Sequence, residues 1–358
     1  MGSTNHTHAA SANAAVNDLR SALALIQDDP TQFITTDHPV DPNAQLAGVY
    51  KHIGAGGTVM RPTRRGPAMQ FTNIVGFEDV SVLVGMLADR ARVAKLLGAT
   101  PTSINHLVAE AFNHAREPVV VTRNEAPVQE KVYLASELDF DIRTLLPAPT
   151  NTPVDAAPFF CMGLLLGTDP QTGHSDVTIH RIAVQGRDEL SIFFAPGRHI
   201  DAFRKKAEAA GKPLPVTINM GLDPAVYIGA CFEAPTTPFG YDELQVAGGI
   251  RHEPVSLVKA LTVEQHAIAR AEIVIEGELL PNVRVREDQN SDTGHAMPEF
   301  PGYNGPANPS IPAKGVTAKT IFDATAPYRL KEQFTRAQFL EVDPRPWAPQ
   351  LHFPEYEG

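Results

Sequence analysis

Three polar residues that occur in order along the middle of the chain could together bind a divalent cation. They are Asp176, His199 and Glu233. Asp176 stands just before an expected strand, His199 at the start of an expected helix and Glu233 at the end of an apolar run. Functional side chains are often placed at such element ends. Their oxygen and imidazole ligands suit Mn²⁺ or Mg²⁺ better than a thiolate-preferring metal. With 13 histidines in the chain such a triple can also arise by chance, so capping, turn or solvated roles for these residues stay open.

Arg181 and Glu299 are two further residues with a candidate chemical role. Arg181 lies in an apolar run that reads as a strand, where it either faces solvent or points inward. An inward Arg181 needs a carboxylate partner, from the protein or from a substrate. Glu299 stands between Pro298 and Phe300. A carboxyl group in this apolar setting can have a raised pKa and act as a general acid, whereas the alternative is a surface-loop glutamate.

The composition is that of a globular protein and argues against two classes of partner. The 358 residues, 43% of them hydrophobic, allow a sizeable core and two domains. A formal net charge of -11 argues against nucleic-acid binding, which usually needs a basic face. No apolar run approaches the roughly 20 residues that span a bilayer. The cysteines, Cys161 and Cys231, lie in apolar runs, so we expect buried free thiols and a cytoplasmic location.

The spacing of apolar residues divides the chain into four segments. Residues 1–13 are small and polar, and we expect them to be disordered. Residues 14–117 are expected to form a mixed α/β unit. In residues 118–320, short apolar runs alternate with turn residues, which predicts a β-barrel or sandwich. Residues 321–358 show little periodicity and are expected to form an irregular tail.

Within these segments the individual helices and strands can be predicted from periodicity. Helical spacing of apolar residues predicts helices at 16–26, 80–97, 104–114 and 200–210. The predicted strands are 119–122, 132–134, 159–166, 177–184, 190–194, 216–220 and 273–275.

Seven segments of the chain carry a resemblance to a known family: residues 126–130, 145–147, 169–173, 213–216, 221–224, 241–249 and 271–277. Together they resemble the UbiD family of prenylated-FMN-dependent decarboxylases, and the resemblance extends from about residue 16 to 320. The resemblance implies an α+β fold in which an N-terminal mixed α/β unit is followed by a split β-barrel domain of the FMN-binding type. It also implies a C-terminal α/β domain, which we expect to be missing here because residues 321–358 do not match it.

The resemblance assigns cofactor-binding roles to residues already singled out. The family's Asn-x-Ser-Ile-x-Arg stretch, which holds the cofactor phosphate and its metal, corresponds here to residues 176–181. The cofactor-binding residues implied in this way are Asp176, Val177, Thr178, Ile179, His180, Arg181, Arg198, His199 and Glu233. The metal ligands would be Asp176, His199 and Glu233, holding Mn²⁺ or Mg²⁺ against the phosphate of prenylated FMN, and a K⁺ ion could join it.

The resemblance also implies the catalytic residues. The family's acid segment, Glu-Gly-Pro-Phe-Gly-Glu, aligns with residues 294–299, so that Glu299 takes the proton-donor position. Arg181 would orient the substrate carboxylate. The family's first glutamate, which supports this arginine, is replaced by Gly294, and the candidate substitute is Glu287 or another nearby carboxylate.

The activity implied by the resemblance is the non-oxidative, reversible decarboxylation of an aromatic or α,β-unsaturated carboxylic acid. A flavin prenyltransferase would supply the cofactor, and a homo-oligomer or a completing subunit is expected. The alternative is an inert remnant of the family that binds a cofactor or a partner without turnover. A third, weaker alternative is a flavin reductase-like protein, because split barrels often bind ordinary FMN.

Overall fold

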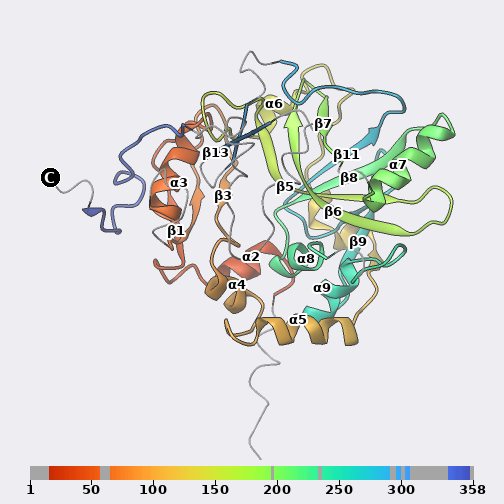
Figure 1. The fold of residues 1–358 in the computed structure, drawn as a ribbon, viewed down its shortest axis with the longest axis horizontal. Helices are drawn as coiled ribbons and strands as arrows, with labels where there is room; N and C mark the ends of the chain where they lie inside the picture. The colour runs from red at the N-terminus through yellow and green to blue at the C-terminus, as the bar shows by residue number, and fades with distance from the viewer. Residues whose placement is uncertain are drawn as a thin grey trace, which may run out of the picture.

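The computed structural model of the protein describes residues 16–56, 65–194, 197–232, 236–290 and 338–354, and the backbone of residues 296–299 and 303–306. The fold is mixed α+β, with a small sheet in the N-terminal part and a curled antiparallel sheet in the centre (Figure 1). Among the described residues no helix is both long and apolar enough to cross a membrane.

The N-terminal part is built on a three-stranded sheet in the order β1-β2-β3. Strands β1 (Phe33–Thr36) and β2 (Ala68–Phe71) pair in parallel, and helix α3 (Gln45–Ala55) connects them in sequence. Helix α2 (Leu19–Ala24) precedes the sheet and begins at Asp18, whose side chain caps it. This confirms the first predicted helix in a shorter form.

The predicted helix over residues 80–97 is wrong. The structure has a short strand, β3 (Val82–Val84), followed by helix α4 (Arg90–Leu96). Gly85 separates the two with a positive φ of 78°, which a helix interior does not allow. A Cβ at Gly85 would also overlap the Tyr50 hydroxyl, and Asp89 caps the start of α4. The apolar spacing therefore came from two different elements.

The central sheet has five antiparallel strands in the order β11-β8-β5-β6-β7. Their bounds are Phe159–Thr168 (β5), Ser175–Val184 (β6), Leu190–Ile192 (β7), Leu214–Met220 (β8) and Ile273–Leu279 (β11). One face packs on helix α7 (His199–Ala209), where Phe203 meets Leu165. This curled sheet confirms the expected split barrel, and five of the predicted strands lie in it.

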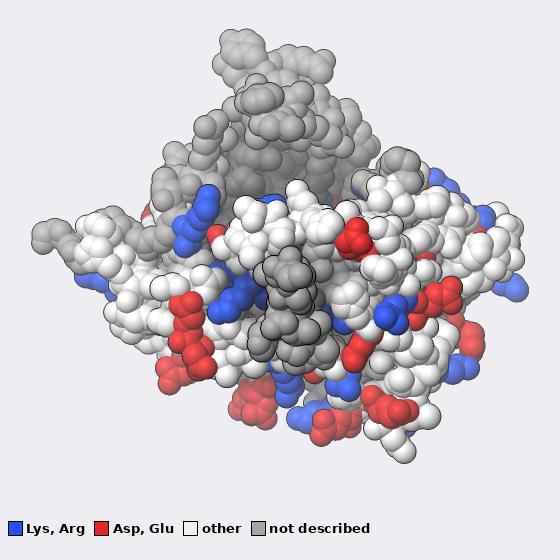
Figure 2. All heavy atoms as spheres, turned by 90° about the horizontal axis from the view of Figure 1, so that it is seen from below, with Lys and Arg blue, Asp and Glu red and all other residues white. Residues whose placement is uncertain are grey.

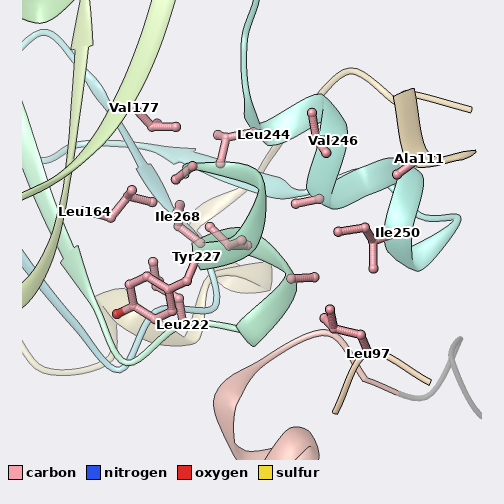
Figure 3. Packing of buried hydrophobic residues seen from close by; sticks show 14 of the residues in the cluster. Leu97, Ala111, Leu164, Val177, Leu222, Tyr227, Leu244, Val246, Ile250 and Ile268 are labelled. Atoms are coloured by element: carbon pink, nitrogen blue, oxygen red, sulfur yellow. The ribbon is translucent and has the colours of Figure 1, made fainter. Parts of the chain in front are cut away.

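The other face of the central sheet packs on helices. Leu164 and Val177 of the sheet meet helices α8 (Pro224–Gly229) and α9 (Leu244–Arg251) in one buried cluster (Figure 3). Helix α5 (Ile104–Asn113), which precedes the expected domain boundary at 117, packs against α9 in the same cluster. Because successive side chains of a strand point to opposite faces, the strands place apolar residues on both faces of the sheet, and helices cover both.

The remaining elements are short. A third sheet has the order β10-β9-β4, from strands Val119–Val121 (β4), Ser256–Lys259 (β9) and His266–Ile268 (β10). The others are η1 (Arg123–Glu125), η2 (Pro127–Gln129), α6 (Ile142–Leu145), β12 (Ala296–Glu299) and β13 (Tyr303–Pro306). The predicted strand at 132–134 is not formed.

Residues 338–354 contain no α-helix or strand but pack into the N-terminal core. Trp347 and Phe353 are buried against residues of the first sheet and α3, and the segment lies beside α3 in Figure 1. The Leu340 carbonyl oxygen lies so near Gly48 that a Cβ there would be only 2.4 Å away. The segment is therefore irregular, as predicted, but it is held in place by packing against the N-terminal core.

The prediction of buried cysteines is wrong, because Cys161 and Cys231 are both exposed, and neither forms a disulfide bond. Cys161 lies in a register shift of β5 between Phe160 and Gly163, which interrupts the alternation of buried and exposed positions.

Acidic and basic side chains are interspersed over the face shown in Figure 2, which is not the continuous basic face of a nucleic-acid-binding surface.

Candidate active site

Asp176, His199 and Glu243 form a cluster with the geometry of a cation site. Asp176 is the second residue of β6, His199 the first of α7, and Glu243 directly precedes α9. One ligand atom from each lies within 4.8 Å of the others. His199 Nδ1 and Asp176 Oδ1 are 3.0 Å apart. Three elements that are distant in sequence therefore bring two carboxylates and an imidazole together.

The two carboxylates are buried with unsatisfied oxygen atoms. Asp176 and Glu243 are each 2% exposed, and Asp176 Oδ2 and Glu243 Oε2 have no hydrogen-bond partner. Burial raises the pKa of both carboxyl groups, and the Asp176 charge raises that of Glu243 further. Two such groups are costly unless a cation or shared protons neutralise them. The oxygen and nitrogen donors fit Mn²⁺ or Mg²⁺.

Glu243 was missed by the sequence analysis, which assigned the third ligand to Glu233. Glu233 lies outside the described residues, so the structure does not place it. Glu243 belongs to the segment 241–249, which was used only as evidence of family resemblance. The available signal was an Asp-Glu pair at the start of an apolar helix, with Asp242 capping Leu244 at 2.9 Å.

Neighbouring aromatic and small residues fix the geometry of the cluster. The ring of Phe239 meets the His199 ring edge-on, with centroids 5.2 Å apart, and packs in the same way on Phe203. Helix α8 ends at Gly229, where a Cβ would lie 2.9 Å from the Glu243 carbonyl oxygen. The close approach of α8 and α9 that places Glu243 thus depends on a glycine.

Arg181 points inward and forms a two-bond ion pair with Glu287. Arg181 Nε donates to Glu287 Oε1 at 2.9 Å, and Nη2 donates to Oε2 at 2.7 Å. The two side chains are 21% and 6% exposed. Of the two alternatives for Arg181, the structure therefore shows the paired one, and Glu287 is its partner. Parallel N–H···O bonds of this kind fix the plane of the guanidinium.

A large cavity lies between the N-terminal part and the central sheet. Its volume is about 2710 Å³, and Ile179, His180 and Arg181 of β6 line it. The His180 ring is bonded to the Thr178 hydroxyl at 2.8 Å, and burial lowers the pKa of His180 to about 4, so the ring is neutral at pH 7. The three residues of the cation cluster do not line this cavity themselves.

The other expected site residues have less direct evidence. Val177 is 1% exposed, and its side chain packs in the core. Arg198 directly precedes α7. Glu299 ends β12, and its backbone pairs with Tyr303 of β13, but its side chain lies outside the described part of the chain.

Comparison with known proteins identifies the family. Residues 27–112 match the N-terminal domain, and residues 119–324 the Rift-related domain, of 3-octaprenyl-4-hydroxybenzoate carboxy-lyase. The chain therefore belongs to the UbiD family.

The particular relatives are named as decarboxylases. The chain is 51% identical to gallate decarboxylase of Lactiplantibacillus plantarum over 304 residues, covering 85% of this chain and 62% of that protein. A solved apo structure of 3,4-dihydroxybenzoic acid decarboxylase from Enterobacter cloacae is 66% identical, with a TM-score of 0.78 over 82% of this chain and 60% of that one.

A more distant solved structure contains prFMN. The UbiD-class enzyme HmfF from Pelotomaculum thermopropionicum, in complex with prFMN, is 31% identical, with a TM-score of 0.70. The match covers 81% of this chain and 62% of that one. The chain thus spans about three fifths of the length of the relatives described here.

Proposed function

We propose that this chain takes part in the non-oxidative, reversible decarboxylation of an aromatic acid, with prenylated FMN and a divalent cation. One observation carries the proposal. Strand β6 has the Asp176 cation cluster near its start, and further along Arg181, paired with Glu287, on the cavity wall. Five residues of strand separate Asp176 from Arg181 by about 17 Å. A flavin nucleotide is similarly extended, with its phosphate and its ring system at opposite ends.

The residues present fit such a cofactor. A cation held by Asp176, His199 and Glu243 would neutralise the phosphate, and the unsatisfied carboxylate oxygens are the ligands it needs. The backbone of Val177 and the residues Thr178, Ile179, His180, Arg181 and Arg198 would line the binding site. Glu233 stays a further candidate for contact. When bound, prenylated FMN supplies an acceptor for the electrons released as CO₂ leaves.

The residues of the chain have distinct roles in this proposal. Arg181 binds the substrate carboxylate, and Glu287 holds the guanidinium in a fixed plane for that contact. The bond between the ring carbon and the carboxylate carbon then breaks. CO₂ leaves, and the electron pair of that bond stays with the ring carbon. Glu299, in its protonated form, donates a proton to that carbon and is reprotonated from solvent.

The relatives suggest the class of substrate. Gallate and 3,4-dihydroxybenzoate, in the names of two relatives, are benzoic acids with adjacent hydroxyl groups. We therefore propose a hydroxylated benzoic acid. A flavin prenyltransferase that supplies the cofactor, assembly into an oligomer or with a completing subunit, and a cytoplasmic location belong to the same proposal.

The test is co-expression with a flavin prenyltransferase, followed by absorbance and mass spectra and a decarboxylation assay on both acids. The expected result is bound prenylated flavin, release of CO₂, and loss of activity with retained cofactor in Glu299→Gln. Bound cofactor without turnover would favour the alternative of a cofactor-binding chain that needs another polypeptide. Full activity of Glu299→Gln would refute the role of Glu299.

A further inference from the structure

Gln185 joins the end of β6 to the turn that carries Glu287. It directly follows the last residue of β6 and is 8% exposed. Its side-chain amide donates to the Glu287 carbonyl oxygen at 3.1 Å and to the Arg286 carbonyl oxygen at 3.4 Å. It also donates to the Ser191 hydroxyl of β7 at 2.8 Å. One buried side chain therefore connects two strands of the sheet to the turn 286–290.

The turn 286–290 also binds Gln185 through a second residue, Asn290. Asn290 donates to the Gln185 backbone carbonyl at 2.6 Å and to its side-chain oxygen at 3.2 Å. A glutamine side chain has two amide hydrogens and one carbonyl oxygen. Both groups are engaged here, so the amide plane has a single orientation that satisfies its partners. Gln185, Ser191 and Glu287 are buried, and hydrogen bonds between buried polar groups favour one arrangement.

Glu287 is consequently fixed at both ends. Its carboxylate receives the two N–H groups of Arg181, and its backbone carbonyl receives the amide of Gln185. Gln185 lies four residues after Arg181 and directly follows the end of β6, the strand that carries Arg181. The short segment from Arg181 to Gln185 therefore sets the distance between the Arg181 guanidinium and the turn 286–290.

We propose that Gln185 is a positioning residue for the Arg181–Glu287 pair. It sets the place of Glu287 and, through it, the plane in which Arg181 presents its N–H groups to the cavity. The consequence for catalysis depends on the proposed decarboxylase function, whereas the effect on the ion pair does not. The two can therefore be tested separately.

Two substitutions at Gln185 and one control test the proposal. Gln185→Leu keeps the approximate size and removes every side-chain hydrogen bond. Gln185→Glu keeps the shape and can still accept from Asn290, but it cannot donate to the carbonyl of Glu287. The matched control is Gln289→Leu. It removes an exposed hydrogen bond from Gln289, in the turn 286–290, to Glu189, in the connection between β6 and β7, at 3.1 Å.

The first readout is the Arg181 Nε–H signal in NMR spectra of protein labelled with ¹⁵N-arginine, assigned through Arg181→Lys. Both Gln185 variants should shift or broaden this signal and speed its exchange with water, and Gln289→Leu should not. The second readout is kcat/KM of the protein loaded with cofactor. It should fall roughly 10- to 100-fold in the Gln185 variants, and KM should be unchanged in the Gln289→Leu control.

The outcomes separate the two proposals. An unchanged Arg181 signal in both folded Gln185 variants, or an equal change in the control, would overturn the positioning role. A changed signal in a protein that never decarboxylates the test acids would keep the positioning role and count against the proposed function. A melting temperature lowered with kcat/KM intact would show that Gln185 acts on stability alone.

Discussion

Glu243→Gln is the substitution that most clearly separates the cation cluster from an ordinary pair of buried acids. The change keeps the shape of the side chain and removes one charge from beside Asp176. If the cluster binds a divalent cation, the variant loses a ligand and the affinity for Mn²⁺ falls. At the same time the metal-free protein loses a repulsion between two carboxylates, so it should become more stable.

The size of this repulsion follows from the geometry. The ligand atoms of Asp176 and Glu243 lie within 4.8 Å of each other. Two unit charges at that separation, with an effective dielectric constant of about 20, repel by about 3.5 kcal/mol. The full value applies only when both groups are ionised. Since burial raises the pKa of both, they retain protons at neutral pH, and the repulsion is fully expressed only above their raised pKa values.

The sign of the pH dependence follows from these raised values. Over the range between the ordinary and the raised pKa values, the folded protein binds more protons than the unfolded chain. Its free energy of unfolding therefore falls as pH rises through the raised pKa values. The metal-free wild type should lose stability there, and Glu243→Gln should lose less. Added Mn²⁺ should restore stability to the wild type and have little effect on the variant.

The assay is urea denaturation from pH 5 to pH 9, with and without Mn²⁺, supported by calorimetric titration of the metal. Glu253→Gln, a change of an exposed carboxylate, is the matched control and should follow the wild type. The reasoning is refuted if Glu243→Gln binds Mn²⁺ as tightly as the wild type, or if its metal-free stability curve runs parallel to that of the wild type.

Three other predictions follow from the packing. Gly229→Ala should weaken Mn²⁺ binding roughly 10- to 100-fold by moving Glu243, whereas Gly277→Ala, which meets nothing within 4 Å, should not; equal titration curves would contradict this. Burial holds the pKa of His180 near 4, below its ordinary 6.5, so the fold should lose up to roughly 3 kcal/mol as pH falls through this range. His180→Gln should remove that loss in urea denaturation at each pH, and parallel curves would count against it. Trp347→Ala should lower the free energy of unfolding by about 3–5 kcal/mol, and a loss below about 1 kcal/mol would show that its segment is not part of the core.

The central sheet could be predicted because each of its strands carries its own pattern. Leu164 and Leu165 are adjacent, yet they belong to clusters on opposite faces, so a continuous apolar run still predicted a strand. Helix α9 was missed because glycines weaken a helical pattern. A Cβ at Gly249 would lie 2.2 Å from the Ala111 carbonyl oxygen of α5, so this glycine serves the packing of two helices. Only the tertiary contact reveals that role.

The site could be predicted in part. Asp176, His199 and Arg181 stand out by residue type in apolar surroundings, and the family resemblance orders them. Glu243 reaches the cluster only because α9 packs on α8, and no local pattern encodes that contact. Glu287 was named from the family resemblance as the support of Arg181, but its contact also depends on how a distant turn is anchored. Long-range packing, rather than residue type, decides these positions.

The most direct test of the account is the location of the bound metal. A crystal of the Mn²⁺-loaded protein, measured near the manganese absorption edge, would give an anomalous density peak. The account predicts a peak within about 2–2.5 Å of ligand atoms from Asp176, His199 and Glu243. A peak elsewhere, or one that leaves Glu243 uncoordinated in favour of Glu233, would contradict the assignment on which the proposed function rests.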